Sequence, residues 1–146
     1  MQENYEITIV GRQTVDRETD EIKVDTFGDY VEKAGIKFIS YMEYDTDAPY
    51  AGRHKIIKLE PNGVATIFNP GTPTRLVLEK GKRHNCMYDT GAGLLSLGVF
   101  TQQLKHDLSP LGGELRISYT LDINTQLSSQ NEILVTLKKR STESEN

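Results

Sequence analysis

Hydrophobic and polar residues alternate with a period of two over much of this 146-residue chain. In the segment 114–123, every second residue from Leu115 to Ile123 is apolar or aromatic, whereas the residues between them are charged or polar. Such alternation predicts a β-strand with one buried face. The same pattern recurs over 5–15, 36–45 and 132–137.

The longest apolar run spans residues 88–101 and is broken only by glycines and small polar residues. Its composition predicts one long bent strand that continues to about residue 104. One face of this strand would carry Leu95, Leu97, Val99 and Thr101, and the other Leu94, Ser96, Gly98 and Phe100. Because both faces are largely apolar, we expect a central strand that is covered on each side.

Turn signals separate the apolar runs, and Asn62-Gly63 is the most specific, since Asn-Gly between two apolar runs predicts a tight hairpin. Further turns or loops are predicted at 16–20, 34–35, 46–53, 69–73, 80–81, 107–113 and 124–131. Less regular strands are predicted at 23–33, 54–59, 64–68, 74–79 and 82–88. The segment 23–33 could also be interpreted as a helix, but Gly28 in its middle and an incomplete apolar face favour a strand. The total is nine or ten strands, with no convincing helix.

These elements predict an all-β fold, a single antiparallel meander β-barrel of about 8–10 strands. Short connections favour antiparallel neighbours, and closure of the barrel removes the unpaired sheet edges. We expect residues 1–140 to form this one domain and residues 141–146 to be a disordered tail. A barrel of this size either fills its interior with side chains or holds one small ligand.

The composition of the chain argues against several classes of binding partner. The formal net charge of −4 disfavours phosphate backbones and anionic lipid, and the basic clusters at 80–84 and 138–140 are interpreted as solvated surface. The chain begins without a signal-peptide pattern, and it has no apolar run of the ~20 residues that a membrane helix needs. The single cysteine, Cys86, points to a reducing compartment. We therefore expect a cytoplasmic protein that binds neither membrane nor nucleic acid.

Three segments, Ile39–Glu43, Tyr88–Gly93 and Gly113–Tyr119, resemble in order and spacing the YwiB-like proteins. These are small bacterial β-barrels with a calycin-type fold, related in shape to lipocalins and avidins. The resemblance covers most of the chain, implies a closed or nearly closed meander barrel, and brings neither catalytic residues nor an assigned role. The chain has no tryptophan, although lipocalins carry a Gly-x-Trp signature and avidins stack tryptophans around their ligand, so neither ligand type is expected.

Five residues are candidates for the lining of the barrel interior: Tyr41, Glu43, Tyr88, Thr90 and Tyr119. Tyr41 and Glu43 share the strand face that holds Ile39, and a lining of tyrosines with a few polar groups is typical of small-molecule pockets.

An inward Glu43 would need a partner or a raised pKa, because a buried carboxylate is costly. The candidate partners are Lys58, Arg75 and Arg116. Glu43 would then be either a polar anchor inside a ligand cavity or one half of an ion pair that plugs a filled barrel.

The segment Asp89–Ala92 reads Asp-Thr-Gly-Ala, the catalytic signature of retroviral-type aspartic proteases. The partner segment that those enzymes need has only a poor match, 110–112, about 20 residues downstream and too close to leave space for a flap hairpin. We interpret Asp89–Ala92 as a glycine-rich turn.

His84 and Cys86 share one strand face and could form a metal pair or a Cys-His nucleophile. Neither has an evident third group, so a buried structural cysteine is the preferred interpretation, and we expect no metal and no cofactor.

Three hypotheses follow. The first is a binding protein that holds a small amphipathic molecule in the barrel, and we prefer it to an enzyme. The second is an enzyme in which Glu43 and Tyr41 act as acid and base. The third is a filled barrel that serves as a scaffold. A homodimer through the strand Leu94–Thr101 would cover its outer apolar face.

Overall fold

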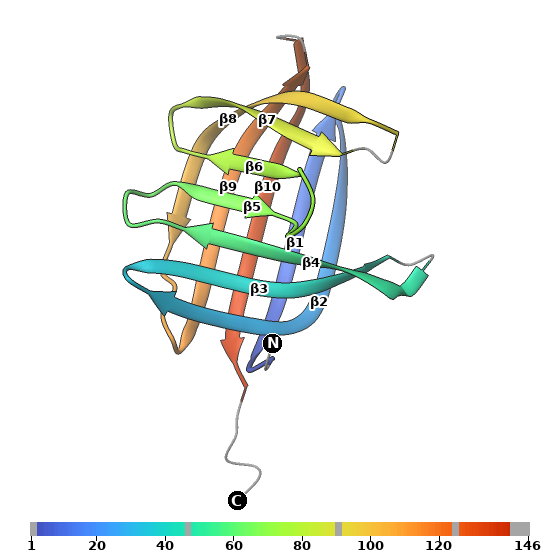
Figure 1. Ribbon diagram of the computed structural model, residues 1–146. Helices are drawn as coiled ribbons and strands as arrows, with labels where there is room; N and C mark the ends of the chain where they lie inside the picture. The colour runs from blue at the N-terminus through green and yellow to red at the C-terminus, as the bar shows by residue number, and fades with distance from the viewer. Residues whose placement is uncertain (1–2, 46–47, 90–91, 124–125, 141–146) are drawn as a thin grey trace, which may run out of the picture.

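The computed structural model describes residues 3–45, 48–89, 92–123 and 126–140, with side chains at all of these except 44–45, 48–53 and 88–89. Ten strands form one closed barrel (Figure 1). They are β1 (Tyr5–Val15), β2 (Glu18–Lys33), β3 (Ile36–Asp45), β4 (Ala48–Leu59), β5 (Ala65–Phe68), β6 (Arg75–Leu78), β7 (Arg83–Asp89), β8 (Leu94–His106), β9 (Gly112–Ile123) and β10 (Gln126–Lys139).

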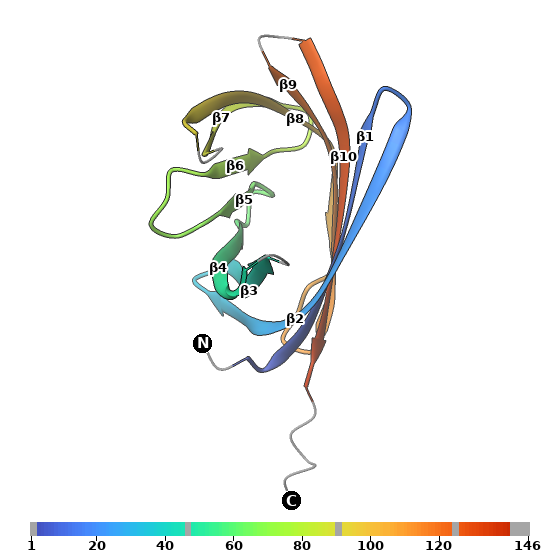
Figure 2. The same cartoon turned by 90° about the vertical axis from the view of Figure 1, so that its right-hand side faces the viewer.

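Each strand pairs antiparallel with the strands that precede and follow it in the sequence, and β10 pairs with β1 to close the barrel. The predicted all-β meander barrel is confirmed, with a strand number at the upper end of the expected range. Strands β1, β2, β9 and β10 make one wall, and β3–β7 run across the opposite side (Figure 2). The described residues contain no helix with the length and apolar character needed to cross a membrane.

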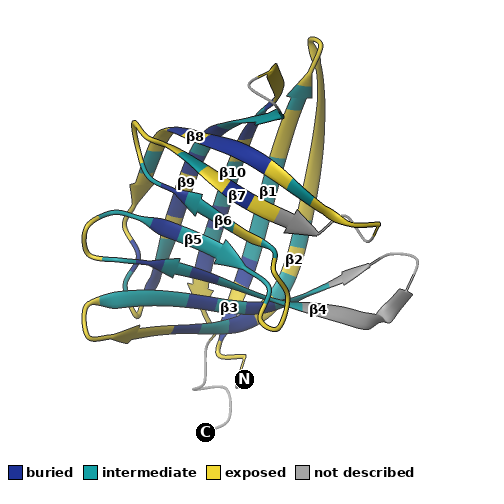
Figure 3. Ribbon diagram, turned by 45° about the horizontal axis from the view of Figure 1, so that its top comes forward, coloured by how far each residue is buried: buried dark blue, intermediate teal, exposed yellow. Residues whose placement is uncertain are grey.

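The predicted alternation sets which side chains enter the barrel. On β9, Leu115 and Ile117 are fully buried, and on β8 the buried residues are Leu97, Val99 and Thr101. Buried and exposed residues accordingly alternate along the strands in Figure 3, whereas the upper ends of β1 and β2 are exposed.

Within the single chain, the outer face of β8 does not have the expected cover. Leu94 and Phe100 lie on its outer face and are 56% and 36% exposed. A closed barrel is a single layer, so the outer face of each strand meets solvent unless another element covers it.

Four predicted boundaries are wrong because local signals did not decide strand pairing. The run 88–101 is not one strand: β7 ends at Asp89 and β8 begins at Leu94, after Gly93 with a φ of +147°. The predicted turn 16–20 shrinks to Asp16-Arg17, because β2 already begins at Glu18.

The other two errors are strands that begin early. Most of the predicted loop 46–53 belongs to β4, because its backbone pairs with β3 in spite of Pro49 and Gly52. Most of the predicted turn 124–131 belongs to β10, which begins at Gln126 and pairs with β9.

The loop between β8 and β9 folds under one end of the barrel (Figure 1). Leu108 is buried in the core cluster. Its carbonyl oxygen accepts a hydrogen bond of 2.6 Å from Lys37 Nζ, and the Tyr5 hydroxyl donates one of 2.8 Å to the carbonyl oxygen of Pro110. Packing and hydrogen bonds therefore hold this loop under the barrel, at the end where β1 begins.

Two glycines permit close approaches that a side chain would block. A Cβ at Gly28 on β2 would overlap the Ser40 carbonyl oxygen, so β2 can press against β3 only with glycine there. On the outer face of β8, Gly98 leaves room for Arg83 of β7 to reach Asp122 of β9, with 3.1 Å between Nε and Oδ2.

Candidate functional site

A cavity of about 930 Å³ occupies the barrel toward the β1–β2 turn, away from the Leu108 loop. Its wall is mainly apolar and draws on strands all around the barrel, with side chains that include Ile9, Val24, Ile57, Ile67, Leu76 and Leu121. Ligand pockets typically measure about 300–1,000 Å³ and combine an apolar wall with a few polar groups. The cavity fits that description in both size and wall chemistry.

Strands β3 and β4 supply one polar part of the wall. Tyr41 and Lys55 are register partners, and Glu43 follows Tyr41 on the same inward face. Lys55 Nζ lies 3.3 Å from Glu43 Oε1, so the carboxylate at the cavity wall has a cation beside it.

Tyr41 is only 4% exposed, and its hydroxyl has no hydrogen-bond partner within the described part of the chain. Burial raises the pKa of this phenol, and the negative charge of Glu43 raises it further. At neutral pH the hydroxyl therefore keeps its proton and can donate a hydrogen bond.

A second polar part lies on β1, β9 and β10. Gln13, Asn131 and Tyr119 are opposite one another in register across these three strands, and all three line the cavity. Asn131 Nδ2 donates a 2.9 Å hydrogen bond to Ser129 Oγ, and these two side chains are 6% and 3% exposed. A buried amide and hydroxyl thus form part of the cavity wall.

The sequence missed Ser129 and Asn131 because they lay in a predicted turn. The signal was present: Ser129, Asn131, Ile133, Val135 and Leu137 continue a single period-two pattern, which the structure places on the inward face of β10.

Of the five predicted lining residues, Tyr41, Glu43 and Tyr119 meet at this cavity. The backbone of Tyr88 belongs to β7, but its side chain lies outside the described residues, as does all of Thr90. The structure brings three of the candidates together, and their role in ligand binding stays a prediction.

The predicted partners of Glu43 were wrong. Lys58 pairs with another carboxylate, Arg75 lies over an aromatic ring, and Arg116 lies on the outer face of β9. The true partner is Lys55, which the sequence placed next to a predicted loop and not opposite Tyr41 in a long strand.

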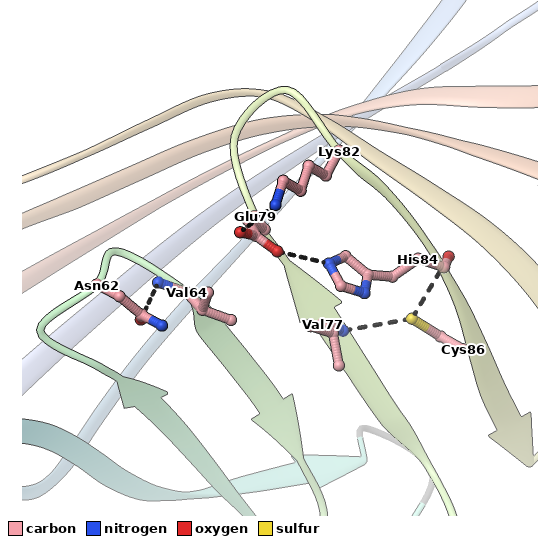
Figure 4. A network of polar contacts seen from close by, with 7 residues as sticks. All are labelled: Asn62, Val64, Val77, Glu79, Lys82, His84 and Cys86. Carbon is pink, nitrogen blue, oxygen red and sulfur yellow. Dashed lines mark hydrogen bonds and ion pairs between the residues drawn. The ribbon is translucent and has the colours of Figure 1, made fainter.

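Strands β6 and β7 meet at a seam where, among the described residues, one pair of register partners is found, Arg75 and Met87. Beyond that pair, the backbone N–H of Val77 donates to Cys86 Sγ at 3.3 Å (Figure 4). Burial raises the pKa of this thiol, which disfavours the reactive thiolate. Cys86 therefore satisfies a backbone group of the seam.

The end of the same seam is joined by side chains. His84 Nε2 lies 2.9 Å from Glu79 Oε1, and Lys82 Nζ lies 3.4 Å from Glu79 Oε2 (Figure 4). The hydrogen bond to His84 is the main cause that lowers the pKa of Glu79. Over the described residues, no three His, Cys, Asp or Glu side chains group closely enough to hold a metal ion. Asp89–Ala92, the protease-like segment, has its central residues and the Asp89 side chain outside the described part.

Comparisons with known proteins extend over nearly the whole chain. A family model described as "Domain of unknown function (DUF1934)" matches residues 7–135. A search of curated proteins finds no match. The crystal structure of the YwiB protein from Bacillus subtilis superposes with a TM-score of 0.80 at 17% sequence identity, covering 94% of this chain and 92% of that one. At this identity the likeness shows a shared fold.

Proposed function

The chain belongs to the DUF1934 family, and we propose that it is a binding protein that holds a small amphipathic molecule inside its barrel. The observation that carries this proposal is the cavity of about 930 Å³, with its apolar wall and a few inward polar side chains. A cytoplasmic location is part of the same proposal.

The cavity also weighs against the scaffold hypothesis, since a scaffold with a solid core would need side chains to fill that volume. The enzyme hypothesis requires Glu43 and Tyr41 to exchange protons. Lys55 Nζ lies 3.3 Å from Glu43 Oε1, so the carboxylate is already engaged in an ion pair, and burial raises the pKa of the Tyr41 phenol. A phenol that keeps its proton beside an ion pair suits binding better than acid–base catalysis.

The test is uptake of N-phenyl-1-naphthylamine, an uncharged apolar dye that fluoresces on leaving water. We expect saturable binding of one dye per chain. Leu121→Lys should weaken that binding by about tenfold, because it places an ammonium group in the apolar wall.

Leu111→Lys is the matched control. Leu111 is 81% exposed and lies in the loop at the other end of the barrel, so the same substitution there should leave dye affinity unchanged. Circular dichroism and thermal unfolding would establish that both variants are folded. Absence of saturable dye binding, or equal loss in the two folded variants, would contradict the proposed function.

A further inference from the structure

The charged side chains of the cavity wall are already matched with one another. Among the described lining residues these are Glu43, Lys55, Lys23 and Asp25. The distance is 3.3 Å from Lys55 Nζ to Glu43 Oε1 and 3.9 Å from Lys23 Nζ to Asp25 Oδ2. Neither pair leaves a charge over for a ligand.

The two pairs differ in where they lie. Asp25 also accepts a hydrogen bond of 2.9 Å from Thr8 Oγ1, and the Lys23–Asp25 pair is well exposed. Glu43 and Lys55 are half-buried on the inward faces of β3 and β4. The pair that a bound molecule would meet is therefore Glu43–Lys55.

The most buried polar groups of the wall are neutral. The Tyr41 hydroxyl has a proton to donate and no partner in the described part of the chain. Asn131 donates one amide hydrogen to Ser129 Oγ, and its carbonyl oxygen accepts no hydrogen bond from any described residue. An uncharged polar group could bond to either of these without displacing an existing contact.

We propose that this cavity selects uncharged amphipathic molecules, with an oxygen that accepts from the Tyr41 hydroxyl, over carboxylates and ammonium ions of the same shape. This inference rests on the proposed function. A carboxylate would have to draw Lys55 from Glu43, and an ammonium ion would have to draw Glu43 from Lys55. In each case one charge is left half-buried without a partner, which costs more than the new contact supplies.

The probes that test this are decanamide, decanoate and decylamine, which share one alkyl length and differ in the charge of the head group. Each would displace N-phenyl-1-naphthylamine from the protein at neutral pH. We expect decanamide to compete at concentrations about tenfold lower than either ion. Tyr41→Phe should weaken decanamide binding about tenfold more than it weakens dye binding, because the dye carries no oxygen that could accept from the hydroxyl.

Glu43→Gln and Lys55→Gln supply the reciprocal test. The first leaves Lys55 unpaired and should shift the preference toward decanoate, whereas the second leaves Glu43 unpaired and should shift it toward decylamine. Opposite shifts cannot arise from a purely structural role of the pair, which would weaken all three probes together. Uniform weakening of all three probes would overturn the inference. So would wild-type protein that binds decanoate or decylamine as tightly as decanamide. In both cases dye binding would still support the proposed function. If the dye itself does not bind, both proposals are wrong.

Discussion

At the residue scale, the buried hydroxyl of Thr101 lowers the stability of the barrel. Its side chain is fully buried on the inward face of β8, and within the described chain its Oγ1 is a buried oxygen with no hydrogen-bond partner. Its backbone is well used, because the Thr101 carbonyl accepts a 2.8 Å hydrogen bond from the Gly81 N–H. The register of β8 against β9 also shifts just after Thr101. Backbone pairing therefore sets the position of Thr101, and its hydroxyl adds no stabilising contact at that position.

Thr101→Val should therefore raise the free energy of unfolding by about 1 kcal/mol, because valine keeps the shape and removes an unpaired polar atom. Urea denaturation would measure the change. Thr120→Val is the control: Thr120 is half-buried on the outer face of β9, and its replacement should change stability by less than about 0.5 kcal/mol. Loss of stability in Thr101→Val would show that the hydroxyl does have a partner.

At the scale of elements, the seam between β6 and β7 differs from its neighbours. In the part of the chain that the structure describes, β7 and β8 are paired along seven consecutive residues, whereas β6 and β7 share one register pair. Side chains replace the missing ladder, through Cys86 toward Val77 and through His84 toward Glu79. Local opening of a protein occurs where backbone pairing is sparse, so we expect this seam to open more readily than other strand pairs.

The Cys86 thiol reports on that opening, because it is buried and reacts only when the seam separates. His84→Ala removes the contact to Glu79 and should speed modification of Cys86 by a thiol reagent severalfold. His54→Ala is matched to it and should leave the rate unchanged, since His54 bonds Ser40 within the stretch of β3 and β4 that is paired without a break. Equal rates of Cys86 modification in the wild type, His84→Ala and His54→Ala would show that the His84–Glu79 contact does not control opening of the seam.

At the scale of the whole molecule, three buried tyrosines make the stability of the barrel depend on pH in the alkaline range. Burial is the main cause that raises the pKa of Tyr5, Tyr30 and Tyr41 above the ordinary 10.0, and carboxylates near each phenol add to it. Above pH 10 the unfolded chain loses these protons while the folded barrel keeps them. The unfolded state then binds fewer protons, so stability is full below that pH and falls as the pH rises.

Ionisation of Tyr41 in the unfolded chain should lower the free energy of unfolding by about 1 kcal/mol between pH 10 and pH 11. Tyr41→Phe removes one of the three and should make the alkaline decline shallower by that amount, as measured from urea midpoints at pH 8, 10 and 11. An unchanged slope would mean that the Tyr41 phenol ionises equally easily in the folded and unfolded states.

The outer surface also bears on assembly at this scale. Leu94 and Phe100 on β8 and Met87 on β7 are exposed. Leu94 and Phe100 belong to the outer face through which the sequence predicts a homodimer along Leu94–Thr101, and that dimer stays a prediction.

The sequence by itself determined the β-strands, their hairpin order and which side chains face inward, because period-two alternation and short turns are local signals. β1 and β3 have their predicted bounds, and of the predicted inward face of β9, Leu115, Ile117 and Tyr119 are buried. Tyr41 and Glu43 could be placed together for the same reason, since they are two residues apart on one strand.

Only the tertiary structure decided what lies opposite them. Pairing with a neighbouring strand extended β4 and β10 through segments whose composition favours turns, and it thereby brought Lys55 to Glu43 and Asn131 into the wall. The size of the cavity likewise depends on how ten strands close and on what fills the end near Leu108. Strand pairing and cavity size both depend on contacts between residues that are distant in the chain, and a local sequence pattern does not encode such contacts.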